Sequence, residues 1–119
     1  MIRTFHMLSL LASILVTYTL LLTVVSDVAR AAPVPAPAAS VSIGNFTFKA
    51  QVLTVRLGTT VTWTNADDIP HTVTSTTGAF KSKVLDSGDK FSFTFAKPGQ
   101  FGYFCSLHPH MTGTVIVKA

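Results

Sequence analysis

Alternation of apolar and polar side chains is the feature that most limits how this chain can fold. In residues 61–64, 91–95 and 101–105, β-branched or aromatic residues alternate with other residues, and Gly, Pro, Asn or Asp lie close to the ends of the runs. A repeat of two residues is typical of strands with one buried face. Residues 41–118 contain no helical repeat. The sequence therefore predicts an all-β domain.

The predicted strands are short and closely spaced. They fall approximately at residues 41–50, 53–57, 61–64, 71–75, 91–95, 101–105 and 113–118. About seven or eight such strands without a helix pack most simply as two antiparallel sheets placed face to face. We therefore predict a Greek-key β-sandwich or barrel.

The N-terminus has the three parts of a secretory signal peptide. Arg3 supplies a positive charge, residues 8–25 form an apolar run, and residues 29–31 read Ala-Arg-Ala, a small-residue cleavage motif. We therefore predict that residues 1–31 are a signal peptide and that the protein is exported, for example to a periplasm. The apolar run is also long enough to span a bilayer, so an uncleaved anchor helix is the alternative.

The segment after the predicted cleavage site is unsuited to a folded core. Residues 32–40 are mostly alanine and proline, which favours an extended linker. Residues 41–119 are then predicted to form one domain, because a segment of this length supports a single core.

The charge of the chain argues against nucleic-acid binding. The formal net charge is +4, but the lysines are dispersed along the predicted domain. A nucleic-acid surface requires a concentrated basic stripe with interleaved aromatic residues. A mildly basic surface is compatible with an acidic protein partner instead.

Cys105 is the single cysteine of the chain, so it cannot form an intrachain disulfide. Small exported domains commonly gain stability from disulfides or from a metal, and a free thiol is a liability in an oxidising compartment. Cys105 is therefore predicted to be a metal ligand, a reactive thiol or a buried apolar residue.

The residues after this cysteine favour copper. Three potential ligands of different softness occur within seven residues: Cys105, His108 and Met111. Blue-copper sites bind the ion through two histidines and one cysteine in a plane, with a distant axial methionine. The second imidazole must come from another segment, and His71, which follows Pro70 at the start of a predicted strand, is the candidate.

Other chemistries fit less well. A structural zinc site is disfavoured because a thioether is a poor zinc ligand and one Cys with one His leaves the tetrahedron incomplete. A thiol hydrolase would need an exposed substrate cleft, which so short a chain can hardly build.

Four other residues that could attract a functional interpretation are given ordinary roles. His110 is predicted to be a solvated imidazole beside the site, Asp67 and Asp68 to be solvated turn residues without a catalytic role, and Trp63 to be a core residue.

The chain resembles the cupredoxin (blue copper protein) family, in particular its amicyanin-like and plastocyanin-like members. The resemblance covers residues 41–118. It rests on Val-Thr-Trp-Thr-Asn at residues 61–65, Pro70-His71, the run from Pro98 to Cys105, and the C-x2-H-x2-M loop. It implies a cupredoxin-like sandwich in which His71, Cys105 and His108 are the equatorial ligands of one copper ion and Met111 is the weak axial ligand.

The resemblance also implies a function. The protein is expected to be a type 1 copper protein, not an enzyme, that shuttles single electrons as a monomer. Its partners are expected to be exported redox proteins, with a dehydrogenase or oxidase as donor and a cytochrome-like acceptor. They would dock transiently near His108, on an apolar patch of Leu107, Pro109 and Ala79. Two alternatives remain open: a copper carrier or storage protein that transfers the metal itself, and an interaction module that binds no metal.

The chain departs from the family pattern at one position beside the site. Many members have Asn directly after the first ligand histidine, whereas this chain has Thr72. The hydrogen bonds of the Asn side chain therefore do not carry over. The backbone N–H of Thr72 is still expected to donate to the sulfur of Cys105, because this bond needs no particular side chain.

Overall fold

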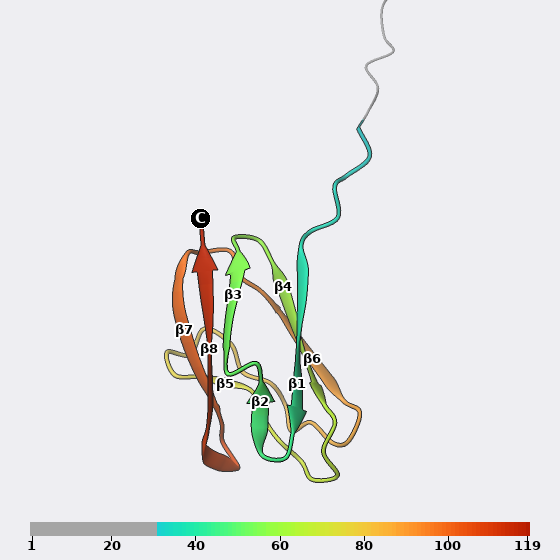
Figure 1. Cartoon of the computed structure of the whole chain (residues 1–119), viewed down its shortest axis with the longest axis vertical. Helices are drawn as coiled ribbons and strands as arrows, with labels where there is room; N and C mark the ends of the chain where they lie inside the picture. Colours follow the sequence, from blue (N-terminus) through green and yellow to red (C-terminus); the bar gives the residue numbers. More distant parts are fainter. Residues whose placement is uncertain (1–30) are drawn as a thin grey trace, which may run out of the picture. The chain divides into compact units, whose positions relative to one another are not determined.

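The computed structural model describes residues 31–119, and the predicted signal peptide lies, except for Ala31, outside the described residues. Within the described part the chain forms eight strands and no helix (Figure 1). The all-β class and the number of strands are thus confirmed. No helix that would be long and apolar enough to cross a membrane is found among residues 31–119.

The strands form two four-stranded sheets, and the chain passes repeatedly from one to the other. The first sheet has the order β2-β1-β4-β6 and the second the order β3-β8-β7-β5. The strands are β1 (Ala38–Gly44), β2 (Thr47–Lys49), β3 (Val52–Arg56), β4 (Thr60–Asn65), β5 (Thr74–Ser75), β6 (Lys90–Thr94), β7 (Gly99–Cys105) and β8 (His108–Lys118).

The prediction of two antiparallel sheets was wrong in one respect. β1 pairs with β4 in parallel, and β3 pairs with β8 in parallel, so each sheet is mixed. The reason is that alternation reports which side chains face the core, and it is the same for both pairing directions. Direction is decided by which strands become neighbours after the chain has crossed between the sheets.

The core lies between the sheets and follows the predicted alternation. In β4 the side chains of Val61 and Trp63 are fully buried, and in β8 Val115 and Val117 face inward while Ile116 faces the other way. The Trp63 ring packs edge-on against Tyr103 of the opposite sheet, with 5.4 Å between ring centroids. Trp63 is therefore a core residue, as predicted.

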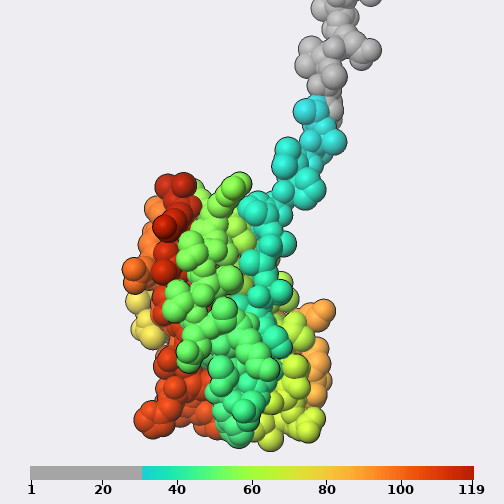
Figure 2. Space-filling model, in the orientation of Figure 1, coloured from blue at the N-terminus to red at the C-terminus, as the bar shows by residue number. Residues whose placement is uncertain are grey.

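Three boundaries differ from the sequence prediction. The segment 41–50 is a hairpin of β1 and β2, and β1 begins at Ala38, within the predicted linker. β8 begins at His108 rather than at Gly113. As a result the β1–β2 turn and the β7–β8 turn lie together at the end of the sandwich opposite the C-terminus (Figures 1 and 2).

Candidate metal centre

Two of the predicted ligands lie at a tight turn between β7 and β8. Cys105 is the last residue of β7 and is fully buried, and His108, the first residue of β8, is half-buried. The two residues are paired across the turn, next to a register irregularity between Phe104 and Cys105. His108 was predicted to lie in a loop, but the strand pairing extends to it. Its backbone is consequently more constrained than that of a loop residue.

Met111 follows three residues later on the same strand. Its side chain is 5% exposed and belongs to the hydrophobic core, whereas Pro109 and His110 are exposed. The alternation of β8 thus turns Met111 inward and leaves His110 toward solvent, as predicted for His110.

His71 comes from the segment that crosses from the first sheet to the second. Its backbone forms two hydrogen bonds with that of Leu85. The N–H of His71 donates to the carbonyl of Leu85 at 3.1 Å, and the N–H of Leu85 donates to the carbonyl of His71 at 2.8 Å. The side chain has no exposed surface. His71 is therefore held by an isolated two-residue bridge rather than by a regular strand.

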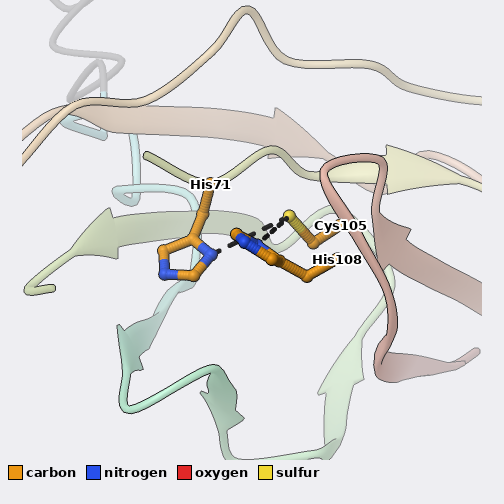
Figure 3. Close-up of side chains that lie close together, drawn as sticks. All are labelled: His71, Cys105 and His108. Atoms are coloured by element: carbon orange, nitrogen blue, oxygen red, sulfur yellow. Dashed lines mark hydrogen bonds between the residues drawn. The ribbon is translucent and has the colours of Figure 1, made fainter. Parts of the chain in front are cut away.

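The three side chains converge on one point (Figure 3). The Nδ1 atoms of His71 and His108 lie 3.8 Å and 3.6 Å from the sulfur of Cys105. One donor atom from each residue lies within 4.8 Å of the other two. The sulfur and two imidazole nitrogens thus face one another at separations that a single ion can bridge. Sequence segments 34 residues apart are brought together here.

Thr72 connects the two halves of the centre. Its backbone N–H donates to the Cys105 sulfur at 3.3 Å, as predicted. Its hydroxyl oxygen accepts a bond of 2.7 Å from the backbone N–H of Ser106 and lies 2.8 Å from the Ser106 hydroxyl. The Thr72 side chain therefore connects the segment that carries His71 to the turn that follows Cys105.

Asp67 is a contributor that the sequence prediction missed. Instead of being a purely solvated turn residue, it accepts a bond of 2.8 Å from Nε2 of His71. The N–H groups of Asn45 and Phe46 also donate to it. The bond from Asn45, with smaller contributions from His71 and Phe46, holds the pKa of Asp67 below its ordinary value, although partial burial opposes the shift. The spacing of four residues between Asp67 and His71 was the only signal in the sequence.

Phe46 is the second residue that was missed. Its ring stands edge-on to both imidazoles, with centroid distances of 5.8 Å to His71 and 5.0 Å to His108. The sequence offered no signal for this contact, because Phe46 lies 25 residues before His71 in a different strand pair.

The donor set fits copper. One thiol sulfur and two imidazole nitrogens form a compact group in which His71 and Cys105 are buried and His108 is half-buried, and the buried Met111 follows three residues after His108 on β8. Soft sulfur combined with imidazole selects copper over the hard cations, and a planar group of one cysteine and two histidines with a weak methionine is the arrangement of electron-transfer sites. The fold and the site thus define a mononuclear copper protein of the electron-transfer class.

Comparison with known proteins leads to the same class and gives the family. The family described as copper binding proteins, plastocyanin/azurin family, matches residues 36–118, and the chain belongs to it. Amicyanin from Paracoccus versutus is 36% identical over 93 residues, which cover 74% of this chain and 70% of the relative. Amicyanin-alpha from Methylorubrum extorquens is 34% identical over 89 residues, which cover 71% and 75% of the two chains.

Solved structures agree with the sequence relatives. A purple cupredoxin from Nitrosopumilus maritimus superposes with a TM-score of 0.63 at 36% identity, over 67% of this chain and 99% of the other. A reduced amicyanin variant gives a TM-score of 0.66 at 31% identity, over 72% and 87% of the two chains. The predicted cupredoxin family and fold are therefore confirmed, and the chain is an electron carrier rather than an enzyme.

Proposed function

We propose that His71, Cys105 and His108 are the equatorial ligands of one copper ion and that Met111 is its axial ligand. The observation that carries this proposal is the convergence of three donor atoms within 4.8 Å of one another, two of them from buried residues. Copper supplies the one-electron couple between Cu(I) and Cu(II). No feature of residues 31–119 favours the alternative in which the metal itself is handed over.

The role of the protein is to hold the ligands still. His71 is fixed by its bridge to Leu85, and Cys105 is fixed by the N–H of Thr72. Ligands that keep their positions in both oxidation states need little rearrangement when an electron arrives or leaves. Hydrogen bonds to the sulfur and burial of the site then tune the potential.

We propose His108 as the point where electrons enter and leave. It is the half-buried member of the group, and exposed apolar side chains of Leu107 and Phe46 lie next to it in sequence or in space. Ala79 lines a pocket with Phe93, Phe95 and Phe101, and we leave it out of the proposed patch. A small apolar patch suits a partner that binds briefly and then leaves.

The partners follow from this role. We propose an exported dehydrogenase or oxidase as electron donor and a cytochrome-like protein as acceptor, both docking at His108. The N-terminal sequence, with its charged, apolar and small-residue parts, supports export. Residues 1–31 are proposed as signal peptide and residues 32–37 as linker, and the copper domain is proposed to run from the start of β1 at Ala38 to residue 119.

Loading the purified protein with Cu(II) tests the ligand assignment. We expect an intense blue or violet thiolate-to-copper absorption band, which Cys105→Ser and His108→Ala abolish. The matched control is His110→Ala, which removes an exposed imidazole two residues from His108 and should keep the band. A band that survives in Cys105→Ser would overturn the assignment.

The axial role of Met111 has its own test. Met111→Leu keeps an apolar side chain of similar size in the core but removes the thioether donor. We expect copper to remain bound and the reduction potential to rise, because loss of a donor disfavours Cu(II). Voltammetry that gives the wild-type potential would show that Met111 is not a ligand.

A further inference from the structure

One carboxylate joins two parts of the molecule that meet at the copper centre. Oδ1 of Asp67 accepts a bond of 2.7 Å from the N–H of Asn45. Oδ2 accepts bonds of 3.2 Å from the N–H of Phe46 and 2.8 Å from Nε2 of His71. Asp67 thus connects the β1–β2 turn, more than 20 residues earlier, with a candidate ligand four residues later.

The bond to His71 determines which ring nitrogen faces the centre with a free lone pair. An imidazole that donates Nε2–H to a carboxylate is neutral only when its Nδ1 carries no proton. Nδ1 is the atom that points at the Cys105 sulfur, 3.8 Å away. The ring is fully buried, so no solvent molecule replaces Asp67 as the acceptor without rearrangement.

The bonds to the turn determine where Phe46 lies. Asn45 and Phe46 both have left-handed backbone conformations, with φ of 51° and 55°. A bulky aromatic residue seldom adopts this conformation, so it requires support from its surroundings. Asp67 gives that support by accepting both N–H groups of the turn. The Phe46 side chain is 51% exposed, yet its ring stands against His71 and His108.

We propose that Asp67 is a positioning residue of the copper centre, whose single carboxylate fixes the tautomer and orientation of His71 and holds the Phe46 ring against both histidine rings. The proposal rests on the proposed function in one respect, the role of His71 as a ligand. It predicts that the ligand and its aromatic cover are coupled, so that a change at position 67 affects both.

Asp67→Asn and Asp68→Asn form a matched pair for the test. Both remove one negative charge without changing the size of the side chain. Asp68 is exposed, whereas the carboxylate of Asp67 accepts the bond from His71. An asparagine at position 67 still offers one oxygen to the turn but meets the Nε2–H of His71 with an amide nitrogen that is itself a donor. The pair therefore separates the hydrogen bond from the charge.

The first readout is the tautomer of His71 in the copper-free protein, measured at one neutral pH by long-range proton–nitrogen NMR. We expect Nε2–H in the wild type and in Asp68→Asn, and a different tautomer or a mobile ring in Asp67→Asn. Because copper is absent, this result is independent of whether the proposed ligand set is right. Wild-type His71 protonated at Nδ1, or an unchanged tautomer in Asp67→Asn, would overturn the proposal.

The second readout is hydrogen exchange at the backbone N–H groups of Asn45 and Phe46. Asp67→Ala removes the acceptor of both, and we expect their exchange to be at least about tenfold faster, while exchange in Asp68→Ala stays at the wild-type rate. Fluorescence of the buried Trp63 verifies that each variant is folded. Exchange rates equal to those of the wild type in a folded Asp67→Ala protein would contradict the second half of the proposal.

Copper-loaded variants complete the comparison. We expect the reduction potential of Asp67→Asn to rise more than that of Asp68→Asn, because the lost carboxylate directly contacts a ligand ring. Phe46→Leu is expected to leave the tautomer of His71 unchanged, since it removes the cover but not the carboxylate. Equal shifts in the two asparagine variants would reduce the role of Asp67 to charge alone and would overturn the positioning role.

Discussion

At the scale of single residues, Thr72 shows how this chain holds its ligand turn without the asparagine common in the family. The hydroxyl oxygen accepts the N–H of Ser106 at 2.7 Å, and the hydroxyl lies 3.9 Å from the Cys105 sulfur. The side chain of Thr72 thus bonds to Ser106, and the backbone N–H of Thr72 donates to the Cys105 sulfur. Thr72 is only 5% exposed, so water competes weakly for these groups.

We predict that Thr72→Val destabilises the metal-free protein by about 0.5–1.5 kcal/mol, because valine has the shape of threonine but removes the hydrogen bond to the N–H of Ser106. Thr72→Ser keeps the hydroxyl and is the control. Urea unfolding followed by Trp63 fluorescence measures both. Equal stability of the valine and serine variants would show that the hydroxyl contributes nothing to the turn.

At the scale of elements, the β7–β8 hairpin depends on a close approach between its strands. Tyr103 is paired with Gly113, and the buried tyrosine ring occupies the space where a side chain at position 113 would begin. A Cβ atom at Gly113 would lie 2.5 Å from the Tyr103 hydroxyl oxygen. The glycine therefore allows a large aromatic residue to fill the core directly beneath the ligand turn.

Gly113→Ala is expected to cost about 1–3 kcal/mol of stability, since the added methyl group overpacks a filled core. Gly102→Ala is the control within the same hairpin, because its Cβ would meet only Thr76 at 3.4 Å and its backbone is not left-handed. Thermal unfolding of the two variants provides the comparison. A Gly113→Ala protein as stable as Gly102→Ala would show that Tyr103 can move aside easily.

At the scale of the whole molecule, both sheets contribute to the centre. Cys105, His108 and Met111 lie on the second sheet, His71 lies on the crossover between the sheets, and Phe46 lies on the turn of the first sheet. Hydrogen bonds within the protein hold these residues together. The fold thus brings the donors together through contacts within the protein.

We therefore predict that the metal-free protein is folded and that copper adds stability without changing the strand content. Free copper at about 1,000 times its dissociation constant should stabilise the native state by about 4 kcal/mol, because it binds only the folded protein. Thermal melts followed by circular dichroism, with and without copper, measure this effect. Cys105→Ser should show a much smaller shift, and a metal-free protein without strand signal would contradict the prediction.

The local parts of this picture were predictable from the sequence. Alternation located most strands because only one face of each strand is buried, and the donor types in the cysteine loop indicated copper because softness is a property of the side chain itself. The ends of β1 and β8 were not predictable, because pairing with a neighbour extends a strand beyond its own pattern. Asp67 looked like a turn residue because two of its partners, Asn45 and Phe46, lie more than 20 residues earlier, and because no motif links it to His71.

The sequence by itself determined the secondary-structure class, the buried faces of the strands and the chemical nature of the four candidate ligands. Only the tertiary structure decided that β1 and β4 run in parallel, that His71 meets Cys105 across 34 residues, and that Phe46 covers both imidazoles. The physical reason is the distance along the chain over which each effect acts. Burial and ligand softness are properties of a residue and its immediate neighbours, whereas these meetings depend on how two sheets pack.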